Sequence, residues 1–177
     1  RVLHSFPSRR YSDLIRFIFS CTAGHSFGGW YAGGLEIFLT GDANDYVGKG
    51  MAGVLLAIRP PMGSAFRSYD ATIAGNTCLY GATGGKLFAA GRAGERFAVR
   101  NSGAITVVEG LGDNGCEYMT GGIVCVLGRT GVNFGAGLTG GLAYVLAADG
   151  EFRKRVTPDL VDVLDVDQLP FHEAHCR

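Results

Sequence analysis

The sequence predicts an all-β fold: a right-handed parallel β-helix, or solenoid, of about seven coils, followed by a short, partly helical C-terminal tail. The main observation is a repeat in which a glycine precedes each short apolar run. These repeat glycines are Gly34, Gly53, Gly84, Gly103, Gly121 and Gly140. The spacings between them are 19, 31, 19, 18 and 19 residues. A unit of this length is too short for a hairpin plus a helix, so each unit fits one coil.

A high glycine content is the second observation, since glycine supplies 29 of the 177 residues against an ordinary share of about 7%. Solenoid corners account for this excess because they require either positive φ or close approach of neighbouring backbones. An antiparallel barrel or sandwich is the alternative, since it also joins short strands by glycine-rich turns. We favour the β-helix because two-residue hairpin signals are absent between the apolar runs.

Along the chain, residues 1–14 stand outside the repeat. Residues 4–14, HSFPSRRYSDL, resemble one reading frame of a common sequencing adapter. We therefore expect 1–14 to be a non-native or disordered leader. The glycine-repeat β-helix is expected to occupy 15–150 and to begin with IRFIF at 15–19. Residues 60–70 contain two prolines and a glycine, and they predict a loop inserted between two coils.

Beyond residue 150 the chain becomes charged and poor in glycine, which indicates a C-terminal tail at 151–177, cut short at its end. Thr157 and Pro158 have the pattern of a helix N-cap followed by its first residue, and a second helix is expected near Pro170. The apolar tail residues Val161, Leu164 and Leu169 are expected to cover part of the sheet.

Alternation along the strands divides their side chains between two faces. The third and fifth residues after each repeat glycine are almost all apolar and are expected to fill the interior. These residues are Ile37, Leu39, Leu56, Ile58, Leu87, Ala89, Thr106, Val108, Val124, Val126, Ala143 and Val145.

The second and fourth residues after each repeat glycine point outward, yet most of them are also apolar. We define the outer face as Phe38, Leu55, Phe88, Ile105, Ile123, Leu142 and Tyr144. A sheet that is apolar on both sides is covered on both sides. We therefore expect the outer face to be an interdomain contact.

Several glycine-rich stretches resemble the C-terminal domain of the glutamate synthase large chain. They are GDANDYVGKG at 41–50, YGATGG at 80–85, AGERFAVRNSGA at 93–104, VVEGLGDNGCEYMTGG at 107–122 and VNFGAGLTGG at 132–141. The likeness runs from about residue 15 to the end of the chain. In that family the domain carries GxGxG repeats and forms a right-handed β-helix.

The resemblance implies an enzyme that makes two glutamates from glutamine and 2-oxoglutarate, using FMN, an iron–sulfur cluster and NADPH supplied through a partner subunit. Its catalytic parts lie in other domains. The glutaminase uses an N-terminal cysteine, whereas this chain begins with Arg1. We therefore expect no catalytic, cofactor-binding or metal-binding residue in this segment. Its expected partners are the other domains of the large chain and the small subunit.

Two other functions stay open. One is a stand-alone β-helix subunit of a related amidotransferase-like or split enzyme. The other is an independent β-helix enzyme of the polysaccharide-active kind, which needs clustered carboxylates on a strand face, whereas the outward positions supply only Glu36.

Charge and cysteine usage narrow the partners and the compartment. A net charge of zero gives no reason to expect nucleic acid or a membrane as a partner. Five scattered cysteines without a CxxC pair indicate reduced, mostly buried thiols in a cytoplasmic protein.

Four polar stretches have the composition of a site. Residues 41–50 suggest an anion cradle of glycine amides and Lys49, but we favour a corner in which Asp and Asn cap backbone amides. Residues 95–100, with one glutamate and two arginines, suggest carboxylate binding, but we favour an ion-pair network along a coil edge or at a domain contact. Residues 113–117 suggest acid–base chemistry, and 172–175 contain two histidines; we interpret both as structural.

Overall fold

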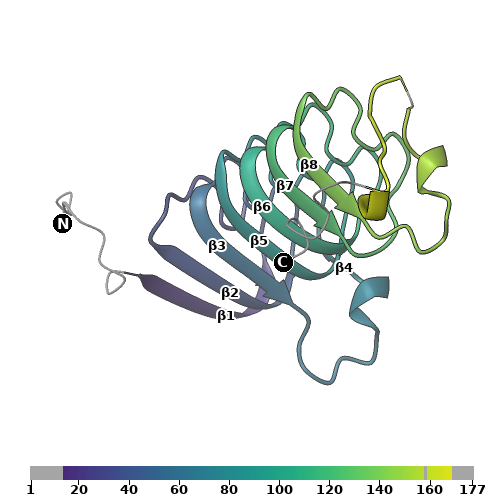
Figure 1. The fold of residues 1–177 in the computed structure, drawn as a ribbon. Coiled ribbons are helices and arrows are strands. Elements are labelled where there is room, and N and C mark those ends of the chain that lie inside the picture. The colour runs from purple at the N-terminus through teal and green to yellow at the C-terminus, as the bar shows by residue number, and fades with distance from the viewer. Residues whose placement is uncertain (1–13, 158, 169–177) are drawn as a thin grey trace.

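Parallel strands follow one another along the chain and stack into a solenoid of about seven coils (Figure 1). The computed structural model describes residues 14–157 and 159–168. The strands are β1 (Ile15–Ala23), β2 (Leu35–Ala43), β3 (Ala52–Arg59), β4 (Thr72–Ala74), β5 (Gly84–Ala93), β6 (Ser102–Gly110), β7 (Thr120–Val126) and β8 (Gly140–Val145). Their order in the sheet is β1-β2-β3-β5-β6-β7-β8, and every pairing is parallel. The predicted parallel β-helix is confirmed, and the antiparallel alternative is wrong.

The long step in the repeat comes from a segment inserted inside one strand. Thr40 of β2 pairs with Arg59 of β3, and Ala43 of β2 pairs with Ala74 of β4. Three residues of β2 therefore correspond to fifteen residues of the next coil, an excess of twelve. The excess contains the loop after Arg59 and the 3₁₀-helix η2 (Ser68–Asp70). As predicted, the chain leaves the solenoid here and β4 completes the interrupted strand (Figure 1).

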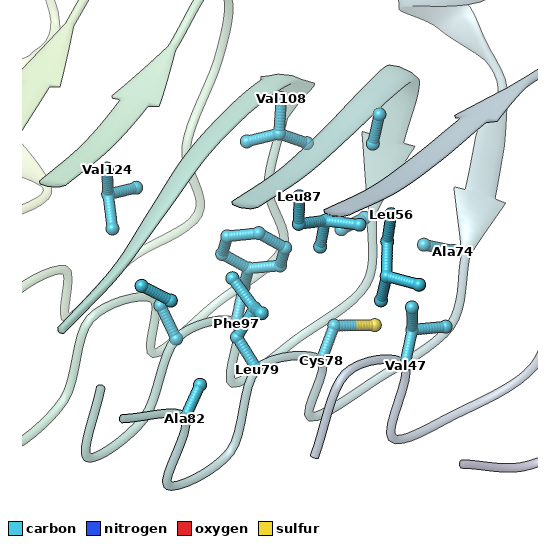
Figure 2. Packing of buried hydrophobic residues seen from close by; sticks show 14 of the residues in the cluster. Val47, Leu56, Ala74, Cys78, Leu79, Ala82, Leu87, Phe97, Val108 and Val124 are labelled. Atoms are coloured by element: carbon cyan, nitrogen blue, oxygen red, sulfur yellow. The ribbon is translucent and has the colours of Figure 1, made fainter. Parts of the chain in front are cut away.

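The predicted interior columns are in register, buried from β2 to β7 and half-buried at Ala143 and Val145 of β8. Ile37, Leu56, Leu87, Thr106 and Val124 pair from strand to strand, and all five are buried. The second column, from Leu39 to Val126, is buried in the same way. Figure 2 shows Leu56, Leu87 and Val108 on the strands facing Val47, Leu79 and Phe97 across the core. The core is therefore the space between the sheet and the turns opposite it.

These turns form a second hydrogen-bonded wall of the solenoid, which we call the turn wall. In each of six coils, three residues at alternate positions have positive φ. In one of these coils they are Tyr46, Gly48 and Gly50. The amides of Tyr46 and Gly50 donate to carbonyls of the following coil, whereas the amide of Gly48 donates to the preceding coil, at 2.8–2.9 Å. Because both walls are bonded from coil to coil, each coil is held on two sides.

The left-handed conformation in this wall extends to residues other than glycine. Leu79, Ala98 and Cys116 occupy the same place as Gly48 with φ of 57–60°, and their side chains are fully buried. An L-residue in this region costs roughly 1–2 kcal/mol. Packing in the core and the two-sided hydrogen bonds offset that cost.

Close backbone approach, more than positive φ, explains the repeat glycines. Of the six, Gly34 has φ in the left-handed region. A Cβ on Gly140 would lie 2.5 Å from the Thr120 carbonyl oxygen, and one on Gly103 or Gly121 would be closer still to the coil behind it. A side chain at these positions would push neighbouring coils apart.

The tail closes the C-terminal end of the solenoid. Phe152, in the 3₁₀-helix η3 (Phe152–Lys154), packs edge-on against Phe134 at 5.4 Å between ring centroids. Val156 and Val163 also pack against the core. Asp149 accepts a 2.6 Å hydrogen bond from Arg155. The tail therefore acts as a lid on the last coil.

One expectation for the tail is wrong. In the described residues no helix begins at Thr157; the amide of Leu160 donates to the Thr157 carbonyl in a turn, and the next element is the 3₁₀-helix η4 (Val166–Gln168). Leu164 is exposed, and with Val161 it lines a groove between the tail and β8 that Leu142 and Tyr144 also line. The leader, Leu169 and the stretch near Pro170 with its histidines lie outside the described residues.

Candidate functional site: the outer face

The outer face consists of two adjacent columns that the strand register holds in line. In the first column, Leu55 is followed by Lys86, Ile105, Ile123 and Leu142 on successive strands. The second column runs Phe38, Ala57, Phe88, Val107, Cys125 and Tyr144. Successive members lie about 4.8 Å apart because that is the spacing of paired strands.

The part of the outer face on β5–β8 forms a continuous apolar patch. Phe88, Ile105, Ile123 and Leu142 are 38%, 38%, 36% and 44% exposed. Val107, Cys125 and Tyr144 lie between them and are half-buried. Phe38 and Leu55 are also half-buried, but Lys86 and Ala57 separate them from this patch. We call the β5–β8 part the apolar patch.

Charged groups border the outer face at its N-terminal end. The Arg16 guanidinium donates two hydrogen bonds to Oε2 of Glu36, at 2.8 and 3.0 Å, and lies 5.5 Å from the centre of the Phe38 ring. Glu36 is the carboxylate that the two outward columns supply. Because Arg16 occupies it, the outer face lacks the paired free carboxylates that glycoside hydrolysis needs.

Residues 41–50 form a structural corner, as we favoured. Oδ1 of Asp45 accepts a 2.7 Å hydrogen bond from the Asn76 amide of the next coil, and Asp42 accepts one from Thr22. The amides of Gly48 and Gly50 already bond to carbonyl oxygens of neighbouring coils. Those glycine amides are therefore not available to bind an anion.

The acidic stretch at 113–117 is also structural. Oδ1 of Asp113 accepts a 2.8 Å bond from the Val132 amide, and Asn133 donates its side-chain amide to Asn114 and Glu117. Each acceptor therefore links one coil to the next.

Among the described residues, an ion-pair network along the coil edge at 95–100 is not present, and the domain-contact form of that expectation stays a prediction. Glu95, Arg96 and Arg100 are exposed, and no ion pair joins them to any residue in the described part of the chain. Arg96 and Arg100 lie on the turn wall, and both side chains are exposed to solvent.

The described thiols differ in environment. Cys78 and Cys116 are buried, and burial raises the pKa of each to about 12. Burial also raises the pKa of Cys125, which is half-buried, whereas Cys21 is exposed. In residues 14–157 and 159–168, no group of three His, Cys, Asp or Glu side chains is arranged to hold a metal ion. In the same residues, no helix has the length and apolarity to span a bilayer.

One surface escaped the sequence reasoning. Phe17 and Phe19 continue the interior columns into β1, where they pair with Ile37 and Leu39, yet both are exposed. The signal is position in the repeat, because the first coil of a solenoid has a neighbour on one side only.

Comparison with known proteins places this geometry in a family. A family model described as "GXGXG motif" matches residues 3–175. The chain is 53% identical over 162 residues to a protein named ferredoxin-dependent glutamate synthase from Pyropia yezoensis, covering 92% of this chain and 10% of that protein. It is 54% identical to a glutamate synthase [NADH] from Schizosaccharomyces pombe, covering 88% of this chain and 7% of that protein. A ferredoxin-dependent glutamate synthase 2 from Synechocystis is 54% identical, covering 90% of this chain and 10% of that protein.

The chain therefore spans about a tenth or less of the relatives that it matches. The match of the family model over nearly the whole chain, together with the glycine-dependent coils, shows that this chain belongs to the GXGXG-motif family, as a segment similar to part of the glutamate synthases.

Proposed function

We propose that this segment is a non-catalytic interdomain scaffold of a glutamate synthase large chain, and that it docks against another domain of that chain through the outer face. The observation that carries the proposal is the apolar patch on β5–β8, where four large side chains are each more than a third exposed. Soluble monomers rarely leave contiguous apolar surface beyond a few hundred Å² open to water.

The energy available for docking is substantial. Fully burying a Leu, Ile or Phe side chain contributes about 1.5–3 kcal/mol. The four patch residues are already more than half covered, so completing their burial contributes about 1 kcal/mol each on the same scale. Together they offer about 4 kcal/mol before the entropic costs of association.

The solenoid suits a scaffold because it is stiff. Coils are bonded to each other through the sheet on one side and through the turn wall on the other. A domain docked on the sheet is therefore held at a fixed place relative to the turn wall. This fixes geometry without any chemistry in the segment itself.

The cofactors of the parent enzyme are proposed to lie in its other domains. By family resemblance the parent uses FMN and an iron–sulfur cluster. The names of two relatives give ferredoxin and NADH as their own electron donors, whereas the resemblance implied NADPH for the parent of this chain. We propose that the donor is set by the other domains or the small subunit, and that a cytoplasmic parent keeps the thiols reduced.

The test grafts this chain in place of the matching segment of the Synechocystis enzyme. Phe88→Asp in the graft should lower glutamate formation and weaken assembly, because docking then buries a carboxylate without a partner. The same change in the isolated chain should leave it folded, since Phe88 is partly exposed there. Tyr118→Asp is the matched control, because Tyr118 is 58% exposed on the turn wall.

Three results would count against the scaffold. The first is an inactive unmodified graft, despite 54% identity. The second is an equal effect of Phe88→Asp and Tyr118→Asp on the graft. The third is unfolding of the isolated chain by Phe88→Asp. A gene that encodes this segment alone, without the other domains, would instead support a separate β-helix subunit.

A further inference from the structure

The first coil leaves the core of the solenoid open. Phe17 and Phe19 are 43% and 40% exposed, whereas Ile37 and Leu39, their partners in the same columns, are buried. The two phenylalanines stack at 6.1 Å, and Phe19 also meets Phe27 edge-on. Aromatic side chains that should be core therefore form the end surface of the molecule.

The backbone at this end is also unpaired. β1 is nine residues long and pairs with β2 along its whole length, but no other described strand lies beside it. Half of its peptide groups point away from β2, as in any edge strand. A long, flat and apolar edge is a template for another strand, and proteins usually cover or blunt it.

The two ends of the solenoid differ in this respect. At the C-terminal end the tail covers the core with Phe152, Val156 and Val163. At the N-terminal end nothing in the described residues plays that part. Repeat proteins need an end unit that differs from the rest and shields the core, so the cap for this end lies outside the described residues.

We propose that β1 is covered by an extended segment of the parent chain that lies N-terminal to Ile15, which adds a strand to the edge and places apolar side chains on Phe17 and Phe19. This inference rests on the proposed function, because it requires the longer chain. The relatives are about ten times longer than the part that matches, so chain is available to do this. The segment before β1 reaches this edge through a single coil, a short connection whose closure entropy is small.

The chemistry of the edge defines the occupant. The added strand must present alternate apolar residues, because Phe17 and Phe19 are two residues apart and face the same way. It needs no counter-charge, since Arg16 is already paired with Glu36. Its place is one coil before β1, so its centre should lie about 19–20 residues upstream, the offset at which Ile15 pairs with Leu35.

The experiment replaces residues 1–14 with the forty or so residues that precede the matching strand in the Pyropia yezoensis relative, a length of about two coils. Amide hydrogen exchange is then measured along β1 in the fused chain and in the unmodified 177-residue chain. We expect exchange in β1 to slow by about tenfold or more in the fusion, because each added hydrogen bond closes an exposed amide. A fusion of the same length in scrambled order is the control.

Two variants separate this inference from the docking of the outer face. Phe19→Ser should abolish the gain in the fusion while changing the unmodified chain little, because Phe19 is partly exposed there. Phe88→Ser should leave the gain intact. Equal β1 exchange in the fused and unmodified chains would overturn the proposal. So would a dimer of the unmodified chain that already protects β1, since a second copy would then be the occupant.

Discussion

Replacing Gly121 with alanine should destabilise the solenoid severely, although alanine is the smallest possible addition. Gly121 does not have positive φ, so its backbone is accessible to any residue. A Cβ at this position would, however, overlap the Ser102 carbonyl oxygen of the preceding coil, far inside the 3.0 Å that real Cβ atoms keep. The obstacle is backbone, which cannot rotate away as a side chain can.

The magnitude follows from what must move. Restoring a normal contact requires β7 to shift away from β6 by about 1 Å. That shift strains the hydrogen bonds that the amides of Thr120 and Gly121 donate to the Asn101 carbonyl, at 2.9 and 3.2 Å. Two hydrogen bonds contribute about 1 kcal/mol each, and forced overpacking costs about 1–3 kcal/mol. We therefore expect a loss of about 3–5 kcal/mol, and a larger one for Gly121→Val.

Urea unfolding of the 177-residue chain measures this loss, and two glycines provide matched controls. Gly24 has an ordinary φ and open space around it, so Gly24→Ala should be neutral or slightly stabilising. Gly81 has open space but φ of 63°, so Gly81→Ala should cost about 1 kcal/mol from backbone strain alone. If Gly121→Ala cost no more than Gly24→Ala, close approach between coils would not explain the repeat glycines.

Three further predictions concern the core and the turn wall. Asn101→Ala should cost about 2–4 kcal/mol in urea unfolding, because the buried amide of Asn101 pairs with the amides of Gly103 and Ala104 and with the Ala104 carbonyl; a cost near zero would contradict this role. Arg100→Asn should raise the free energy of unfolding by about 0.5 kcal/mol, and Arg100→Val should lower it by about 1–2 kcal/mol. Asparagine tolerates positive φ, whereas β-branched residues do not. The reverse order of stabilities would contradict the left-handed turn. Burial raises the pKa of the Cys78 and Cys116 thiols to about 12, against 9.0 for a thiol in water. Stability is therefore full below about pH 9 and should fall as pH rises from about 9 toward about 12, and a Cys78→Ala, Cys116→Ala double variant should lose that slope.

The period of the repeat was enough to predict the fold because one physical constraint repeats in every coil. Strict alternation along the strands separated Leu56 and Leu87 from Phe88, and the structure places them on opposite sides of the sheet as predicted. The inserted segment was visible for the same reason, since twelve extra residues break a regular spacing. Strand register can be predicted from the alternation of apolar residues whenever one face of the sheet is buried in a core.

Local sequence predicts only part of the turn wall. Gly48 and Gly50 suggest left-handed turns, but Leu79, Ala98 and Cys116 adopt the same conformation with no local preference for it. Their φ values are imposed by hydrogen bonds to residues 19 to 32 positions away in sequence. Propensity cannot report a conformation that distant neighbours enforce.

The candidate site was partly predictable. The outward direction of Ile105, Ile123 and Leu142 follows from alternation, but the amount of surface left open depends on the tail. The tail was expected to cover part of the sheet, and it packs mainly on the last coil, where Phe152 meets Phe134. The exposed aromatic residues of β1 escaped prediction for a similar reason: residues of the interior columns were all taken to be enclosed, whereas an end coil has one neighbour.

The central claim is that the apolar patch on β5–β8 is a contact surface in the parent enzyme. Hydroxyl-radical footprinting tests it most directly, by comparing the reactivity of individual side chains in the isolated chain and in the Synechocystis graft. The account predicts that Phe88, Ile105, Ile123 and Leu142 lose most of their reactivity in the graft, while Tyr118 on the turn wall keeps its own. Equal reactivity of the four patch residues in both forms, in a graft that is assembled and active, would contradict it.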